Sequence, residues 1–247
     1  MAAKQRWYLG PLLPWDTEST GVDVETDRIV TAALVWIRPD EKTMIKHHLI
    51  DPGVPIPAEA IAIHGITNER VAAEGRQPEG ALEEIADDLV DALNAGWPLV
   101  GMNCVYDLTL LDRELRRHGL RTLEERRGGE PIAPVIDAMV LDKLVDPPLR
   151  GKGRRRLTAL CEIWGVRLDG AHDAHFDALA AARVVWKIAR THPEIGEMSL
   201  PDLHALQVKA RAQQCAELRA YFDSVGKPHD GVPGEWPMLP YRERAAV

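Results

Sequence analysis

Two carboxylates stand two positions apart in the segment LLPWDTESTGVD, which runs from Leu12 to Asp23. In an extended strand the side chains at i and i+2 leave the same face, so Asp16 and Glu18 would point the same way. Crowded carboxylates repel each other, and a shared proton, solvent or a bound cation relieves the repulsion. A hard divalent ion suits such oxygen ligands. A solvated strand end is the competing interpretation, because an Asp-x-Glu triplet alone is common.

Two later segments offer further acidic side chains together with a histidine. Asp107 follows the apolar run that carries Leu99 and Val100, and it stands at the start of a predicted helix. In the segment AHDAHFD, His172 precedes Asp177 by five residues, and Asp177 opens another predicted helix. Taken singly, each aspartate is equally well explained as a residue that stabilises a helix N-terminus.

The elements that position these residues indicate an α/β layer architecture with a mixed sheet. Pro14 removes a ladder donor and leaves the pairing near it in doubt. In the predicted 106–118 helix, leucines point inward and arginines outward. Apolar and β-branched runs predict strands at 7–15, 28–38, 44–50, 98–101 and 134–138, and helical periodicity predicts helices at 57–63, 78–95, 106–118, 156–164, 176–191 and 201–225.

Composition sets the outer bounds on function. The chain has 247 residues and 45% apolar content, enough for one substantial domain with an appendage. It has no apolar run near the length of a membrane span and no signal segment, so we expect a soluble cytoplasmic protein with no membrane partner. Three scattered cysteines predict reduced thiols.

The charge distribution is compatible with an enzyme that acts on nucleic acid. A net charge of -8 argues against a passive nucleic-acid coat protein but not against a nuclease, whose metal site is acidic by construction. Five basic residues lie between 150 and 156, among them Arg154 and Arg155. They are candidates for phosphate contacts, and a solvated loop is the alternative.

Four ordered motifs resemble those of the DnaQ-like (DEDDh) exonuclease family. They are D-T-E-S-T-G at 16–21, I-H-G-I-T at 63–67, N-x-x-x-D at 103–107 and H-x-A-x-x-D at 172–177. The resemblance covers roughly residues 7–191 and implies an RNase H-like fold, a mixed five-stranded sheet flanked by helices. It also divides the chain into an exonuclease domain, 1–191, and a C-terminal helix with a Pro/Gly-rich tail, 192–247.

The resemblance implies 3′→5′ exonuclease activity with two Mg²⁺ or Mn²⁺ ions. His172 matches the family's general base, although His175 in the same string is a competing imidazole. Two ions can generate a hydroxide near neutral pH and stabilise charge on the scissile phosphate, and a histidine can accept the proton. The positions that match the family's four acidic metal ligands are Asp16, Glu18, Asp107 and Asp177.

Further residues are expected to contact the substrate. His64 would line the pocket for the terminal nucleotide, or else it caps the turn before Gly65. The backbone of Thr17 would lie beside the phosphate, and Asn103 would touch the second nucleotide or support the helix of Asp107. The predicted substrate-binding set is Thr17, His64, Asn103, Arg154 and Arg155.

The favoured substrate is a single-stranded or frayed 3′ end of DNA, cut to nucleoside 5′-monophosphates in proofreading, repair or DNA degradation. The first alternative is an exoribonuclease that trims RNA or oligonucleotides. The second is a catalytically silent module that binds nucleic acid or a polymerase, which the costly acidic cluster argues against. The C-terminal helix is expected to pack on the catalytic domain, and docking to a polymerase or second subunit is the other possibility.

Overall fold

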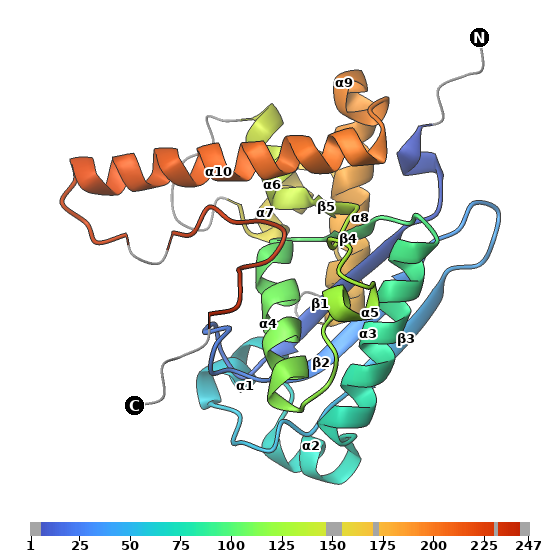
Figure 1. Cartoon of the computed structure of the whole chain (residues 1–247), viewed down its shortest axis with the longest axis vertical. Coiled ribbons are helices and arrows are strands. Elements are labelled where there is room, and N and C mark those ends of the chain that lie inside the picture. The colour runs from blue at the N-terminus through green and yellow to red at the C-terminus, as the bar shows by residue number, and fades with distance from the viewer. Residues whose placement is uncertain (1–5, 147–154, 170–172, 230–231, 243–247) are drawn as a thin grey trace.

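The computed structural model of the chain describes residues 6–146, 155–169, 173–229 and 232–242. Its centre is a mixed five-stranded sheet in the order β3-β2-β1-β4-β5 (Figure 1). The predicted α/β fold, with a mixed five-stranded sheet, flanking helices and a C-terminal helix, is confirmed. The strands are β1 Leu13–Ser19, β2 Ile29–Trp36, β3 Met44–Leu49, β4 Leu99–Gly101 and β5 Val135–Asp137.

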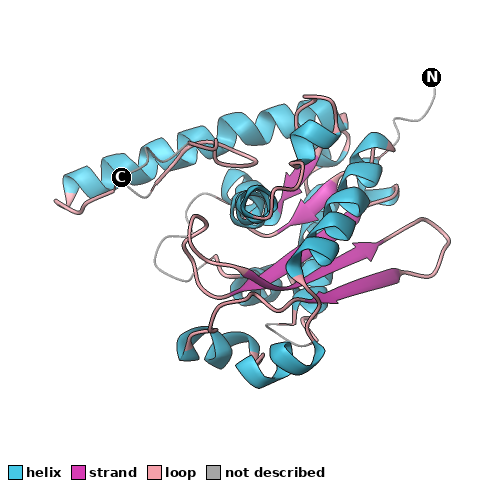
Figure 2. Cartoon of the chain, turned by 60° about the horizontal axis from the view of Figure 1, so that its bottom comes forward, coloured by secondary structure: helices cyan, strands magenta, loops and turns pink. Residues whose placement is uncertain are grey.

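Helices cover both faces of the sheet (Figure 2). The apolar run at the N-terminus is partly helical, because η1 (Trp7–Leu9) occupies the first part of the predicted 7–15 strand. The short helices α2, α5, α6 and α9 lie outside the predicted set. The α-helices are α1 Ala58–His64, α2 Asn68–Glu74, α3 Pro78–Asn94, α4 Cys104–Arg117, α5 Leu123–Arg126, α6 Ala138–Val145, α7 Leu157–Trp164, α8 Ala174–Thr191, α9 Pro193–Gly196 and α10 Leu200–Ser224.

β1 is the central strand, antiparallel to β2 and parallel to β4. The hydrogen-bond ladder of β1 shows how the strand pairs near Pro14. The ladder to β2 begins at the pair Trp15 and Leu34, after an isolated bridge at Leu12, while Pro14 pairs with Val100 of β4 on the other side. Because proline has no N–H to donate, the interruption falls at Pro14, ahead of the residues that carry the chemistry.

Alternation along β1 separates its residues between two hydrophobic layers. Leu13 and Trp15 are buried in a cluster with residues of α3 and α4. α8 packs against β1 and β2 on the opposite face, in a second cluster. Since successive side chains of a strand alternate, Asp16 and Glu18 face α8 while Thr17 faces α4.

The C-terminal region packs on this sheet at two places. α10 lies against α6 and β5, with Leu203 and Gln207 fully buried. Its later part extends beyond the body, and the tail after it returns toward α4 (Figure 1). Trp236 in this tail is only 6% exposed and joins the same core cluster as α3 and α4. Within the described ranges, no helix is both long and apolar enough to cross a membrane.

Candidate active site

Three carboxylates converge between the sheet and α8. Asp16 and Glu18 come from β1, and Asp177 comes from the first turn of α8. One carboxylate oxygen from each lies within 4.8 Å of the others. Residues more than 150 positions apart therefore present oxygen ligands to one point, because α8 packs on the face of β1 from which Asp16 and Glu18 project.

Asp107 reaches the same region from the other layer. It lies in the first turn of α4 and is 5% exposed. Thr17 donates two hydrogen bonds to its Oδ1, from Oγ1 at 2.6 Å and from the backbone N–H at 3.2 Å. Thr17, predicted to lie beside the substrate phosphate, thus fixes Asp107 against β1 with both its hydroxyl and its N–H.

The electrostatics show how crowded the four carboxylates are. Burial, and then the charges of Asp107, Asp177 and Glu18, raise the pKa of Asp16 well above its usual range. Burial, followed by the charges of Asp177 and Asp107, raises the pKa of Glu18 to about 8. Burial also raises the pKa of Asp107 to about 7, against the lowering effect of the hydrogen bonds from Thr17. A divalent cation bound by these oxygens would relieve their repulsion.

This crowding predicts that removing the Glu18 charge stabilises the metal-free protein at alkaline pH. The pKa of Glu18 is about 8 in the folded protein against 4.5 for a free side chain. Its raised pKa therefore favours the folded state at low pH, and that contribution is lost as pH rises toward 8. In EDTA, Glu18→Gln should melt above wild type at pH 8, with the gap closing toward pH 4.5. The control is Glu217→Gln on the exposed part of α10; a pH-independent gap would contradict the crowding.

The N-terminus of α4 is held by a residue that sequence reasoning missed. Asn103 precedes the helix in the left-handed conformation, with φ of 65°. Its N–H donates to Asp137 Oδ1 at 3.0 Å, and the N–H of Cys104 donates to Asp137 Oδ2 at 2.9 Å. Asp137 also accepts from Trp236 Nε1 at 3.3 Å. Only its place at the end of the predicted 134–138 strand, beside the parallel strand that leads to Asp107, could have singled it out.

We expect Asp137→Asn to weaken activity without unfolding the protein. The amide leaves one oxygen for the N–H groups of Asn103 and Cys104, so the start of α4 and Asp107 would shift. Losses of about 10- to 100-fold are typical when support for a metal-site group is disturbed. The rate should fall and more Mg²⁺ should be needed to reach half activity. Asp91→Asn, on the exposed face of α3, is the matched control; an unchanged Mg²⁺ dependence would refute the positioning role.

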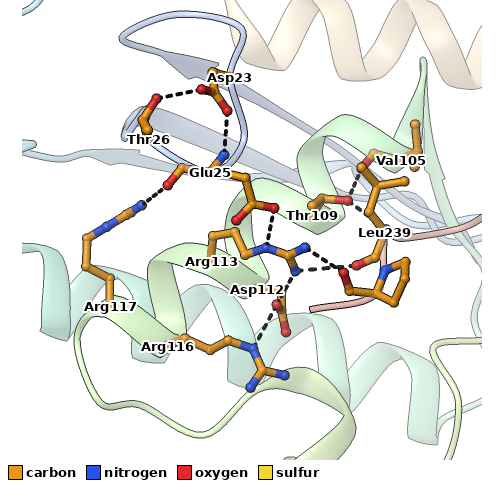
Figure 3. Close-up of polar contacts among 11 residues, drawn as sticks. Asp23, Glu25, Thr26, Val105, Thr109, Asp112, Arg113, Arg116, Arg117 and Leu239 are labelled. Carbon is orange, nitrogen blue, oxygen red and sulfur yellow. Dashed lines mark hydrogen bonds and ion pairs between the residues drawn. The ribbon is translucent and has the colours of Figure 1, made fainter. Parts of the chain in front are cut away.

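Side chains on the outer face of α4 form hydrogen bonds with the loop after β1 and with the C-terminal tail (Figure 3). Arg113 was expected to point outward, yet its side chain is 4% exposed. It donates to Glu25 at 3.0 Å, to Asp112 at 2.6 Å and to the carbonyl of Leu239 at 3.4 Å. Leu239 in turn donates its N–H to Thr109 Oγ1 at 3.0 Å. The expectation failed for Arg113 because the loop after β1 and the C-terminal tail cover this face of the helix.

Three of the remaining predicted residues are His172, Arg154 and Arg155. His172 and Arg154 lie outside the described residues. Arg155 is bound within the protein, since its guanidinium pairs with buried Asp142 and its side chain is 8% exposed. A phosphate contact by Arg155 would break that pair, so its position does not support the predicted role.

His64 and Asn103 keep both of their predicted roles open. His64 ends α1, and its Nδ1 accepts the N–H of Ile66 at 3.1 Å, which is the turn-capping role considered for it. α1 packs in a hydrophobic cluster with Val30 of β2. The residue before Val30 is Ile29, which pairs with Ser19 at the end of β1. The side chain of Asn103 makes no capping hydrogen bond to α4. Substrate contacts by both residues stay predictions.

A comparison with protein families places the chain in a known group. The family model RNase_T, described as Exonuclease, matches residues 14–185. The chain belongs to this exonuclease family. The matched segment contains all four carboxylates, and the predicted DnaQ-like relationship is confirmed.

Curated relatives of this exonuclease domain include much longer proteins. The DNA polymerase III PolC-type of Halalkalibacterium halodurans is 27% identical over 180 residues, covering 73% of this chain and 11% of the polymerase. The Listeria monocytogenes protein of the same name is 27% identical over 193 residues, covering 76% of this chain and 12% of its own length. This chain therefore spans only a small part of those relatives.

Solved structures of exonuclease I share the fold at low identity. Escherichia coli exonuclease I in complex with a dT13 oligonucleotide superposes with a TM-score of 0.60 at 19% identity, covering 75% of this chain and 42% of that one. Exonuclease I from Methylocaldum szegediense gives a TM-score of 0.61 at 22% identity, covering 85% and 45%. This chain thus spans less than half of either solved chain.

Proposed function

We propose that this chain is a metal-dependent 3′→5′ exonuclease that removes nucleoside 5′-monophosphates from the 3′ end of DNA. The observation that carries the proposal is the convergence of Asp16, Glu18 and Asp177 within 4.8 Å, with Asp107 held beside them by Thr17. A protein without such chemistry gains nothing from a cluster in which burial and mutual repulsion raise the pKa of Asp16 and Glu18.

The ligand set fits two Mg²⁺ or Mn²⁺ ions. All four candidate ligands are carboxylates, which hard cations prefer, and burial together with the charges of its neighbours raises the pKa of Asp16. Bound ions would supply an activated water and electrostatic stabilisation of the charge on the phosphate and the leaving alkoxide. Asp16, Glu18, Asp107 and Asp177 would hold them.

The protein's own residues would then orient the reaction. The hydrogen bonds from Thr17 hold Asp107 in one orientation, so its carboxylate would be positioned in advance for a bound ion. His172 would accept the proton of the attacking water, since its unperturbed pKa lies near working pH. His64 and Asn103 would contact the terminal and second nucleotides, as the family resemblance implies.

DNA is the proposed substrate for two reasons. The curated relatives are named as DNA polymerases, and a related fold was solved with a DNA oligonucleotide. RNA is the substrate of the alternative, an exoribonuclease. The two differ by the 2′-hydroxyl, so matched DNA and RNA strands separate them.

We further propose that residues 1–191 form the exonuclease domain and that 192–247 are an extension supporting it. Two hydrogen bonds support this division into a domain and a supporting extension. Trp236 of the tail donates to Asp137, and Arg113 of α4 donates to the carbonyl of Leu239 in the tail. A polymerase is the proposed partner, because polymerases are among the relatives, and α10 is the proposed docking element. Co-elution of the chain with a replicative polymerase, lost when the exposed Leu218 and Tyr221 of α10 are replaced by serine, would test this.

The test of the proposed function uses 5′-labelled single strands of DNA and RNA with one sequence, in Mg²⁺, Mn²⁺ or EDTA. We expect stepwise shortening of the DNA from its 3′ end with a divalent ion and none in EDTA. A circular single strand should resist, because the reaction needs a chain end. Cutting of the circle, or faster loss of RNA than of DNA, would overturn the corresponding part of the proposal.

A further inference from the structure

A second cluster of metal-ligating side chains lies beside the acidic site. His47, Asp173 and His175 each offer one ligand atom, and these atoms lie within 4.8 Å of one another. None of the three belongs to the acidic cluster. His47 comes from the edge strand β3, whereas Asp173 caps α8 and His175 lies in its first turn. The cluster therefore joins the sheet edge to the start of the helix that carries Asp177.

The sheet register fixes its position relative to the acidic site. Asp16 pairs with Ala33 of β2, and Ala33 pairs with His47 of β3. Directly paired residues share a face, so His47 projects toward α8 on the same side as Asp16, about 10 Å away across two strand spacings. α8 crosses this face and brings Asp177 to Asp16 and His175 to His47. The two clusters are neighbours but have separate ligands.

The side chains of the second cluster already lie together. His175 Nδ1 is 2.6 Å from Asp173 Oδ1, and the rings of His47 and His175 meet edge to face with centroids 4.7 Å apart. His47 and Asp173 are exposed and His175 is half-buried, so an ion could enter from solvent. Ligand atoms around a tetrahedral ion with bonds of about 2.0 to 2.1 Å are somewhat over 3 Å apart, so side-chain rotations would complete the geometry.

We propose that His47, Asp173 and His175 form a zinc-class metal site that fastens β3 to the N-terminus of α8. Two imidazoles and one carboxylate suit Zn²⁺ or Co²⁺, whereas Mg²⁺ prefers oxygen ligands alone. The ion leaves at least one coordination position for water. Its binding ties the first turn of α8, which carries Asp177, to the edge of the sheet. The bound ion would therefore link the sheet edge to α8 next to the acidic centre.

The test measures metal binding by the full chain, without reference to hydrolysis. Zn²⁺ is titrated against a chromogenic chelator in excess Mg²⁺, which occupies the oxygen-only centre. We expect one Zn²⁺ per chain for wild type, and a weakening of about 100-fold or more for His47→Ala, since even outer supports of metal sites cost 10 to 100-fold. His118→Ala removes a histidine paired with Glu79 elsewhere and serves as the matched control.

A second variant separates the two centres. Asp16→Asn should retain Zn²⁺ binding, and Zn²⁺ should raise the melting temperature of wild type and Asp16→Asn but not of His47→Ala. His47→Gln repeats the test with a polar side chain of similar size, in case the alanine variant does not fold. The proposal is overturned if wild type binds no Zn²⁺, or if Asp16→Asn abolishes binding while His47→Ala and His47→Gln keep it.

Discussion

Asp16→Asn should reduce hydrolysis of a single-stranded DNA 3′ end by about 10³-fold or more, because it removes charge stabilisation at the centre of the site. One carboxylate oxygen of Asp16 lies within 4.8 Å of an oxygen of Glu18 and of Asp177, and burial, followed by the charges of Asp107, Asp177 and Glu18, raises its pKa. The charges of the other three carboxylates therefore all act on Asp16. The asparagine keeps the shape of the side chain but loses the negative charge that a cation needs. Initial rates at saturating Mg²⁺ measure the effect.

The fold of the Asp16→Asn variant should remain intact. Because the neutral side chain relieves repulsion among buried carboxylates, the variant should melt at or above the wild-type temperature in EDTA at pH 8. Glu217→Gln makes the same carboxylate-to-amide change on exposed α10 and should leave the rate unchanged. If Asp16→Asn retained most of the activity while Glu217→Gln behaved as wild type, the acidic cluster would not be the catalytic centre.

The second large effect is expected at His172. Loss of a general base typically costs about 10² to 10⁴-fold, so His172→Ala should slow hydrolysis within that range in Mg²⁺. A base that titrates also shapes the pH profile, and the acidic limb of kcat/KM should flatten in the variant. Rates from pH 6 to pH 9 with saturating Mg²⁺ measure both effects.

His175→Ala is the matched variant in the same segment. His175 pairs with Asp173 at 2.6 Å and lies against His47, so its ring is already engaged outside the acidic cluster. In zinc-free buffer we expect His175→Ala to hydrolyse DNA almost as fast as wild type. The opposite pattern, with His175→Ala inactive and His172→Ala active, would show that the assignment of the base within the HDAHFD segment is wrong.

Local sequence patterns were sufficient to predict the framework of the site. The i, i+2 spacing of Asp16 and Glu18 placed both on one face because a strand has a period of two. The apolar periodicity after Asp107 and after Asp177 placed each at the start of a helix. The ordered motifs then gave the fold and family, which the match over residues 14–185 confirms.

The supports of the site depend on contacts that local patterns do not encode. Asp137 reads as an ordinary strand residue, and only the parallel pairing of β4 with β5 brings it to the N–H groups of Asn103 and Cys104. Arg113 reads as a solvated helix residue, but the C-terminal tail, more than 120 positions later, covers it. Such long-range packing overrides local preference.

The same reason explains the partners of Thr17 and Arg155. Alternation along β1 predicts that Thr17 points away from Asp16 and Glu18, but not that α4 brings Asp107 to it. A cluster of basic residues predicts phosphate contacts, but not that Asp142 of α6 is buried opposite Arg155. In both cases the sequence identified the polar side chain, but tertiary packing determines which group it binds.

The most direct measurement of the central claim is a crystal structure of the chain with Mn²⁺ and a nucleoside 5′-monophosphate, recorded with anomalous scattering. The account predicts two Mn²⁺ peaks among Asp16, Glu18, Asp107 and Asp177, with the phosphate beside them. Mn²⁺ bound only elsewhere, or a phosphate seated away from these four carboxylates, would contradict it.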